Sequence, residues 1–165
     1  MVHSAGHRAA IRVVVALVAV VALSTAAEAQ ISIQSPQSLV GFQGGGSIDP
    51  EQAFVGVFWQ SPPIGNRLHL RPGIDGGFGG GVRVATINID FIARFSLGAS
   101  GWDLIQGGGP VIAITKIDGF EGTDTSAGGS YLIGFAHDSG FFGEFRIGGG
   151  NTPSLKMGAG YAVRF

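Results

Sequence analysis

Over Val82–Phe95 the residues alternate between two kinds of side chain. Ile89 and Phe91 fall on one face of an extended chain, and Asn88 and Asp90 fall on the other. Successive side chains of a β-strand point to opposite faces, so this period of two indicates a strand. The same alternation recurs down the chain, and after residue 29 a Gly or Pro interrupts every run of apolar residues at helical spacing. The pattern predicts an all-β protein.

We predict eight strands, at 38–46, 51–60, 67–78, 81–96, 102–116, 129–138, 140–149 and 155–165. Strands of about ten residues are long enough to cross a bilayer at a tilt of about 45°. The fifth strand contains Gly107-Gly108-Gly109-Pro110. Because Pro cannot donate a hydrogen bond to a neighbouring strand, we predict a bulge or bend there.

The first 29 residues have the three parts of a secretory signal peptide. Arg8 and Arg12 make the start positive, Val13–Leu23 is an unbroken apolar run, and Ala27-Glu28-Ala29 is a small-residue cleavage site. An uncleaved anchor helix is the alternative, but eleven apolar residues rise only about 16 Å, against a bilayer core of about 30 Å. We therefore predict an exported protein with a signal peptide at 1–29, a short segment at 30–37 and one domain at 38–165.

Composition excludes several classes of protein. The chain has no Cys, which excludes disulfides, thiol nucleophiles and Cys-ligated zinc. Removing residues 1–29 changes the formal net charge only from −1 to −2, without the basic excess of a nucleic-acid-binding protein. Glycine is abundant, at 30 of 165 residues, but none of its clusters continues as Gly-Lys-Ser/Thr or opens a helix. We interpret these clusters as turns and as interior positions that leave room for neighbouring side chains, not as phosphate-binding loops. We predict no cofactor and no metal.

The connections favour an up-and-down barrel. If both ends of the barrel lie on the periplasmic side, odd-numbered connections face outward, and the longest connection, 117–128, is odd-numbered and polar. Long outer loops with short periplasmic turns are typical of outer-membrane barrels. Aromatic residues at strand ends on the predicted periplasmic side would form an interfacial girdle of Trp59, Phe95, Trp102 and Phe165.

The faces opposite the apolar ones are unusual for a soluble sheet. They combine Gly with charges of both signs, as expected for the interior of a small membrane barrel whose apolar face meets lipid. Buried charges must be paired, so we predict a nearly self-neutralising interior network. Its candidate members are His69, Arg71, Asp75, Asp90, Arg94, Glu144, Arg146, Lys156 and Arg164. The alternative is that these are surface charges on a soluble sheet.

The chain ends in LKMGAGYAVRF. A terminal Phe after alternating hydrophobic residues resembles the assembly signal of bacterial outer-membrane barrels, matched by Lys156, Gly158, Tyr161, Val163 and Phe165. With the segments at 68–79 and 142–165, residues 40–165 resemble the small OmpA/OmpX-like outer-membrane β-barrel domain. The resemblance implies that the outer-membrane assembly machinery reads the terminal strand. We also predict outer-membrane lipid and lipopolysaccharide as partners, and a monomer without an open pore, because eight strands leave no aqueous channel. Because members of the family have different functions, the resemblance implies the location and the fold of the protein more than its function.

Two other functions remain open from the sequence. The first is a soluble secreted or periplasmic barrel that holds a small apolar ligand, which would need an apolar interior. The second is a lipid A-modifying hydrolase, because His137-Asp138-Ser139 has the H-x-S spacing of outer-membrane deacylases. Gly140-Phe141 replaces the Asn-Ala that follows this motif in the deacylases, and Glu144 comes too soon to be the acid. We therefore predict no catalytic residues and a structural or surface-interaction role through 117–128.

The same outer connection holds three carboxylates at a spacing of three: Asp118, Glu121 and Asp124. Hard cations such as Ca²⁺ and Mg²⁺ take oxygen ligands, so these residues could bridge a divalent cation to lipopolysaccharide. We interpret them instead as a solvated polar loop.

Overall fold

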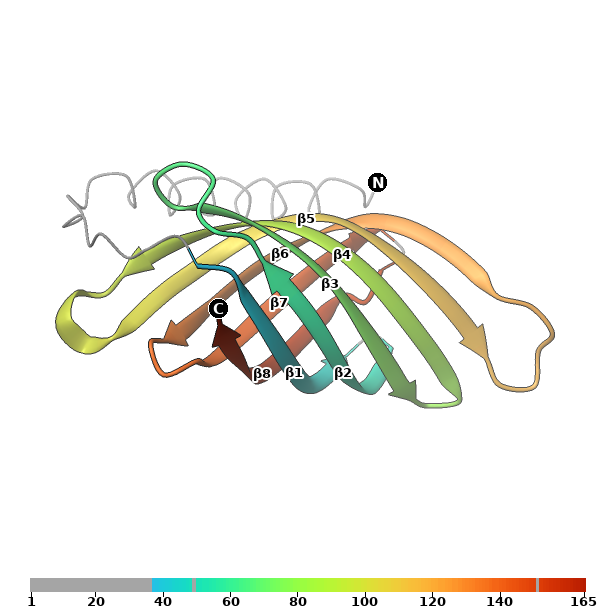
Figure 1. The fold of residues 1–165 in the computed structure, drawn as a ribbon. Helices are drawn as coiled ribbons and strands as arrows, with labels where there is room; N and C mark the ends of the chain where they lie inside the picture. Colours follow the sequence, from blue (N-terminus) through green and yellow to red (C-terminus); the bar gives the residue numbers. More distant parts are fainter. Residues whose placement is uncertain (1–36, 49, 151) are drawn as a thin grey trace, which may run out of the picture. The chain divides into compact units, whose positions relative to one another are not determined.

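The computed structural model describes residues 37–48, 50–150 and 152–165, so the predicted signal peptide lies outside the described residues. Eight antiparallel strands pair in chain order, and β1 pairs with β8 to close the barrel (Figure 1). The predicted closed, up-and-down antiparallel barrel is confirmed. The strands are β1 (Leu39–Ile48), β2 (Glu51–Gln60), β3 (Leu68–Gly79), β4 (Val82–Ser96), β5 (Trp102–Ile117), β6 (Asp124–His137), β7 (Phe141–Gly150) and β8 (Leu155–Arg164).

We call the end of the barrel where β1 begins and β8 ends the base, and the opposite end the top. The base carries the connections 61–67, 97–101 and 138–140, and the top carries 49–50, 80–81, 118–123 and 151–154. A short 3₁₀ turn, η2 (Gly98–Ser100), lies in one connection of the base. The part of the chain that the structure describes contains no helix long and apolar enough to cross a membrane.

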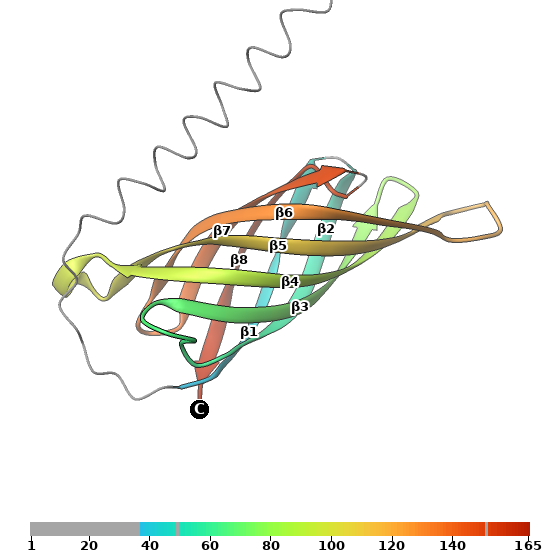
Figure 2. The same ribbon diagram turned by 90° about the horizontal axis from the view of Figure 1, so that it is seen from above.

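The connection predicted at 117–128 is wrong in its extent. Strand β6 begins at Asp124, and residues Asp124–Gly128 pair with β5 from Thr115 to Val111. Pairing between β6 and β7 starts only at Gly128, so the β5–β6 hairpin continues past its β7 neighbour and projects from the barrel (Figure 2). Above a barrel both faces of a hairpin meet water, which explains why polar Asp, Thr and Ser residues there keep a strand conformation without alternating.

The predicted contrast between long top loops and short base turns is also wrong. The seven-residue connection 61–67 at the base is longer than the six-residue connection 118–123 at the top. Pro62 and Pro63 cannot donate to a ladder, so β2 ends at Gln60. Beyond the end of β2, the hydroxyl of Ser61 accepts a hydrogen bond from the Leu70 amide of β3 at 3.0 Å.

Of the bulge or bend predicted at Gly107–Pro110, no bulge forms. The β4–β5 register is the same on both sides of this segment, with Asn88 opposite Val111 and Phe91 opposite Gly108. The β5–β6 register is continuous, with Pro110 opposite Gly129. Only the pairing toward β4 lapses, over two positions, because Pro110 has no N–H to donate.

Candidate functional site

The interior of the barrel holds a layer of ion pairs contributed by β3, β4 and β7. Arg146 donates two hydrogen bonds to Asp90, at 3.0 and 2.8 Å, and its guanidinium lies 3.6 Å from Glu144. Arg71 donates to the other oxygen of Glu144. All four side chains are buried. A charge in such a place needs a partner, since removing one member leaves the other uncompensated in a medium of low dielectric.

Asp75 organises a second cluster in the same layer. Its carboxylate accepts hydrogen bonds from Gln43 at 2.7 Å, Thr86 at 3.0 Å, Asn88 at 3.0 Å and Lys156 at 3.2 Å. These donors come from β1, β4 and β8, so one carboxylate on β3 links strands on several sides of the barrel. Hydrogen bonds to a charged acceptor are roughly twice as strong as those between neutral groups.

The two clusters form what we call the charge layer, and its charges balance. It contains three carboxylates and three cations: Asp75, Asp90, Glu144, Arg71, Arg146 and Lys156. Six of the nine residues predicted for the interior network are thus brought together.

The other three members of the predicted set lie toward the base, apart from the charge layer. Arg94 pairs with Asp103 through hydrogen bonds of 2.7 and 3.1 Å. Arg164 is 31% exposed and pairs with exposed Asp138 at 3.2 Å. The Nδ1 atom of His69 lies 2.9 Å from the backbone oxygen of Ser61.

Asp103 was not among the residues predicted for the interior network. It falls two residues before buried Ile105 on the same strand, so alternation through 103 and 105 could have placed it on the inner face.

An apolar layer fills the barrel between the charge layer and the base. Phe58 and Phe142 pack edge to face with ring centroids 5.4 Å apart, and the guanidinium of Arg71 lies 4.0 Å above the Phe58 ring. The buried members are Leu39, Phe58, Ile92, Ile105, Leu132, Ala136 and Phe142.

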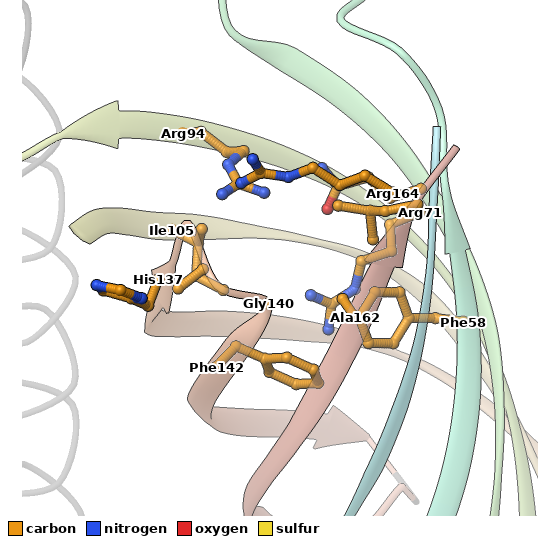
Figure 3. Close-up of a pocket in the computed structure, with 12 residues that line it drawn as sticks. Phe58, Arg71, Arg94, Ile105, His137, Gly140, Phe142, Ala162 and Arg164 are labelled. Carbon is orange, nitrogen blue, oxygen red and sulfur yellow. The ribbon is translucent and has the colours of Figure 1, made fainter. Parts of the chain in front are cut away.

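A pocket opens at the base, with Phe58, Ile105 and Phe142 of the apolar layer and Arg71, Arg94 and Arg164 on its wall (Figure 3). A smaller pocket lies above the charge layer, lined by Arg146, Lys156 and Thr152. The charge layer therefore lies between the two pockets, with Arg71 facing the basal one and Arg146 and Lys156 facing the upper one.

The outer face is apolar along every strand. Exposed Phe42, Val55, Ile74, Phe91 and Phe145 are examples from five different strands. Within this face Gln106 and Tyr131 form a polar pair. Gln106 points outward from β5 but is only 7% exposed, and its Oε1 atom accepts a hydrogen bond of 3.0 Å from the Tyr131 hydroxyl.

The residues predicted as an aromatic girdle lie at the base. Trp59, Trp102 and Phe165 are exposed, whereas Phe95 is half-buried beneath the Arg67 guanidinium, which lies 5.4 Å from the ring centroid.

The residues matched to the assembly signal lie at the end of the chain, on β8 and at Phe165. Tyr161, Val163 and Phe165 are exposed on the outer face, and Lys156 and Gly158 are buried inside the barrel. The Phe165 amide donates to the Ser38 carbonyl at 3.0 Å, so the last residue helps to close the barrel.

The His-x-Ser motif forms a contact but not a triad. Nδ1 of His137 lies 2.7 Å from Oγ of Ser139 in the base connection. Glu144, the candidate acid, is buried in the charge layer against Arg71. Asp138, between His137 and Ser139, pairs with Arg164. The nucleophile and base therefore lack an orienting carboxylate among their described contacts.

The acidic residues of the β5–β6 hairpin do not form a metal site. Within residues 37–48, 50–150 and 152–165, no group of three or more His, Cys, Asp or Glu side chains could hold a metal ion. Asp118 instead lies 3.5 Å from the Arg83 guanidinium, with both side chains well exposed.

No family model matches the sequence, and no curated protein matches it. Among solved structures, the chain is similar to the N-terminal β-barrel domain of Pseudomonas aeruginosa OprF, with a TM-score of 0.64 and 12% identity over 79% of this chain and 98% of that one. It is also similar to Neisserial surface protein A, NspA, with a TM-score of 0.57 and 14% identity over 78% and 95%. Ail, the attachment invasion locus protein of Yersinia pestis, gives a TM-score of 0.45 and 11% identity over 77% and 97%. The first two show that the chain has the fold of small eight-stranded outer-membrane barrels, as predicted.

Proposed function

We propose that this protein is an integral protein of the bacterial outer membrane, closed to passage of solutes, with a structural or surface-interaction role. The observation that carries the proposal is the polarity of the barrel, because its outer face is apolar while its interior holds six buried charges. Soluble monomers rarely expose contiguous apolar patches larger than a few hundred Å². A membrane barrel needs just this arrangement.

The length of the apolar face fits a bilayer. On β5 the outward-facing residues from Leu104 to Ile114 are apolar apart from Gln106. Ten residues at about 3.3 Å each and a tilt of about 45° span about 23 Å along the membrane normal, against an apolar band of about 25 Å in outer-membrane barrels. The aromatic residues at the base then lie at the lower interface, where Trp is favoured. The predicted export signal and terminal assembly signal agree with this location.

The absence of a pore is supported by the interior. Eight strands leave space only for side chains. Here the charge layer and the apolar layer both cross the barrel. The guanidinium groups of Arg71 and Arg146, each paired with a carboxylate, occupy its middle.

The projecting β5–β6 hairpin is the part that we assign to surface interactions. Its connection carries Phe120, which is 73% exposed, together with Asp118 and Glu121. An exposed aromatic side chain among polar residues suits contact with a macromolecular partner. NspA, which shares the fold, is called a surface protein.

The two alternatives receive less support. A barrel that binds an apolar ligand needs an apolar interior cavity, whereas both cavities here are lined in part by Arg or Lys. A hydrolase acting on lipid A of the outer leaflet needs its residues at the top, whereas His137 and Ser139 lie at the base.

Location is tested by cell fractionation followed by electrophoresis of boiled and unboiled samples. We expect sedimentation with the outer membrane and a heat-dependent shift in mobility, because a closed barrel resists detergent until it is heated. Recovery in the soluble periplasm without a shift would refute the proposal.

Orientation is tested with single cysteines, for which the Cys-free chain is a clean background. We expect a membrane-impermeant maleimide to label Glu121→Cys at the hairpin tip on intact cells. The matched control, Ala99→Cys at the base, should react only after permeabilisation. Labelling of the control alone on intact cells would place the hairpin in the periplasm and refute its surface role.

A further inference from the structure

The pocket at the base gathers positive charge around one space. Arg71, Arg94 and Arg164 line it, and none of the described residues on its wall is a carboxylate. Arg94 on β4 and Arg164 on β8 extend toward each other across this basal pocket, although their strands are not neighbours in the sheet (Figure 3). A cleft lined by charges of one sign attracts ions of the opposite sign. The basal pocket therefore favours an anion.

The three guanidinium groups keep donors that the barrel does not use. Each binds one carboxylate through Nη2, and Arg94 binds its carboxylate through Nε as well. Within the part of the chain that the structure describes, Nη1 of Arg71, Arg94 and Arg164 has no hydrogen-bond partner. A guanidinium carries five N–H donors, so each arginine can bind its carboxylate and a second anion at once.

Gln60 adds an unpaired amide to the same wall. It lies at the end of β2, is only 4% exposed and lines the basal pocket. Its side chain makes no hydrogen bond to any other residue that the structure describes. Burying an amide without a partner is unfavourable, so buried polar groups are nearly always hydrogen-bonded. The amide of Gln60 is therefore available to a molecule that enters the pocket.

The rest of the wall is apolar, because the pocket reaches the apolar layer at Phe58, Ile105 and Phe142. Small-molecule sites typically combine apolar walls with a few polar groups that fix the orientation of the ligand. We propose that the basal pocket binds a small organic carboxylate. Its oxygens accept hydrogen bonds from Arg94, Arg164 and the Gln60 amide, and its hydrocarbon part lies against the apolar layer. That hydrocarbon part must be short, since the apolar layer closes the pocket.

The source of the carboxylate follows from the orientation of the barrel. The pocket opens at the base, which faces the periplasm in the proposed orientation, so the ligand would be a periplasmic metabolite. This assignment of the source rests on the proposed function. The binding chemistry does not, because the same residues line the pocket whichever way the barrel lies in a membrane.

The test is a saturation-transfer NMR titration of hexanoate against the protein in lipid nanodiscs, with empty nanodiscs as the blank. We expect Arg94→Gln/Arg164→Gln to bind at least about tenfold more weakly, because the carboxylate loses its charge-assisted hydrogen bonds. The matched control, Arg67→Gln/Arg83→Gln, removes the same charge outside the pocket and should keep wild-type affinity.

Gln60→Glu is a second variant that does not remove any partner of a buried carboxylate. It places a carboxylate of the chain itself in the basal pocket, where the arginines can bind it. We expect this variant to lose hexanoate binding and to remain as resistant to heat as the wild type. A general loss of folding cannot produce this combination.

Two comparison ligands test the two halves of the site. Formate lacks the hydrocarbon part and 1-hexanol lacks the charge, so each should bind the wild type at least about tenfold more weakly than hexanoate. Equal binding of formate would show an anion site without an apolar half, and equal binding of 1-hexanol would show an apolar site without a carboxylate preference. Either result would overturn the inference.

The inference is also refuted if the folded wild type does not bind hexanoate, if folded Gln60→Glu keeps wild-type affinity, or if the control loses as much affinity as Arg94→Gln/Arg164→Gln. The heat-dependent mobility shift of each variant reports the barrel itself. A wild type that shows the shift without binding hexanoate refutes this site and leaves the proposed location standing. Hexanoate binding by a protein recovered in the soluble periplasm would refute the location and support the site.

Discussion

Arg146 on β7 and Asp90 on β4 are joined across the barrel interior by two hydrogen bonds of 3.0 and 2.8 Å, although their strands are not neighbours in the sheet. Arg146 also donates to the Ser130 hydroxyl at 2.8 Å. The pair therefore ties three walls of the barrel together through one guanidinium. Its geometry, with two donors on two carboxylate oxygens, is the strongest that an Arg–Asp pair adopts.

We expect Arg146→Met to lower the free energy of unfolding by about 3–5 kcal/mol, because Asp90 then remains buried and charged without its partner. Urea unfolding of the protein in lipid vesicles measures this loss. Arg83→Met is the control, since its side chain is 71% exposed and its ion pair with Asp118 should contribute little. Equal losses in the two variants would mean that the inward and outward faces have been exchanged.

The double variant Asp90→Leu/Arg146→Met should be more stable than Arg146→Met alone. Removing both charges leaves no uncompensated ion, and replacement of a buried pair by apolar residues is often neutral. A double variant less stable than the single one would show that Glu144, 3.6 Å from Arg146, depends on that guanidinium more than Asp90 does.

A second prediction concerns glycine residues that leave room for a neighbouring side chain. A Cβ atom on Gly41 would lie 2.2 Å from Cζ of Phe58, its cross-strand partner, so the ring lies directly over the glycine. Phe58 cannot simply move aside, because Phe142 and Arg71 pack against it. We expect Gly41→Val to destabilise the barrel by about 1–3 kcal/mol through overpacking, measured by the same unfolding experiment.

Gly76 is the matched control for Gly41. It also lies in a strand, but a Cβ there meets nothing within 4 Å. Val is favoured in strands, so Gly76→Val should leave stability unchanged or raise it slightly. A large loss at Gly76 would show that glycine is needed there for its backbone and not for space.

A third prediction uses the polar pair on the outer face. Tyr131→Phe removes the hydroxyl that donates to Gln106, leaving the amide oxygen unpaired in lipid. We expect a loss of about 1–3 kcal/mol in vesicles. Gln106→Leu/Tyr131→Phe should recover most of it, since an apolar side chain suits that face. If the outer face met water instead of lipid, Tyr131→Phe would cost little because water could replace the hydroxyl, and that result would count against the membrane location.

Alternation along Val82–Ser96 was enough to predict a strand and its inner face, because one face must be apolar and the other must not. The same reasoning failed for Asp124–Ala127, where both faces of the projecting hairpin can be polar. It failed also at Pro110, where the missing N–H suggested a bulge. There β5 keeps its register and only lacks pairing with β4 over two positions. The alternation of side chains along a segment indicates whether its two faces meet water, lipid or the interior. It does not indicate where the segment pairs with its neighbouring strands.

Which charges pair could not be predicted from the sequence. Lys156 meets Asp75 and Arg146 meets Asp90 at sequence separations of 81 and 56 residues. These partners are set by the stagger of strands around the closed barrel, a property of the whole sheet. Alternation places a charge inside without giving its height relative to charges on distant strands. Arg164 illustrates this limit, because it has inward parity but lies at the base with Asp138.

The last prediction concerns the closed interior. We expect no steady conductance from the wild type in a planar bilayer, because the apolar layer and the charge layer each block the barrel. Phe58→Ala/Phe142→Ala empties much of the apolar layer but leaves the charge layer intact, so it should stay closed. Adding Arg71→Ala and Glu144→Ala removes one complete ion pair above that space, and the four-residue variant should conduct, provided its heat-dependent mobility shift shows a folded barrel. Conductance in the two-residue variant would mean that the aromatic rings alone close the barrel, and a folded but closed four-residue variant would mean that Arg146 and Lys156 with their carboxylate partners are sufficient.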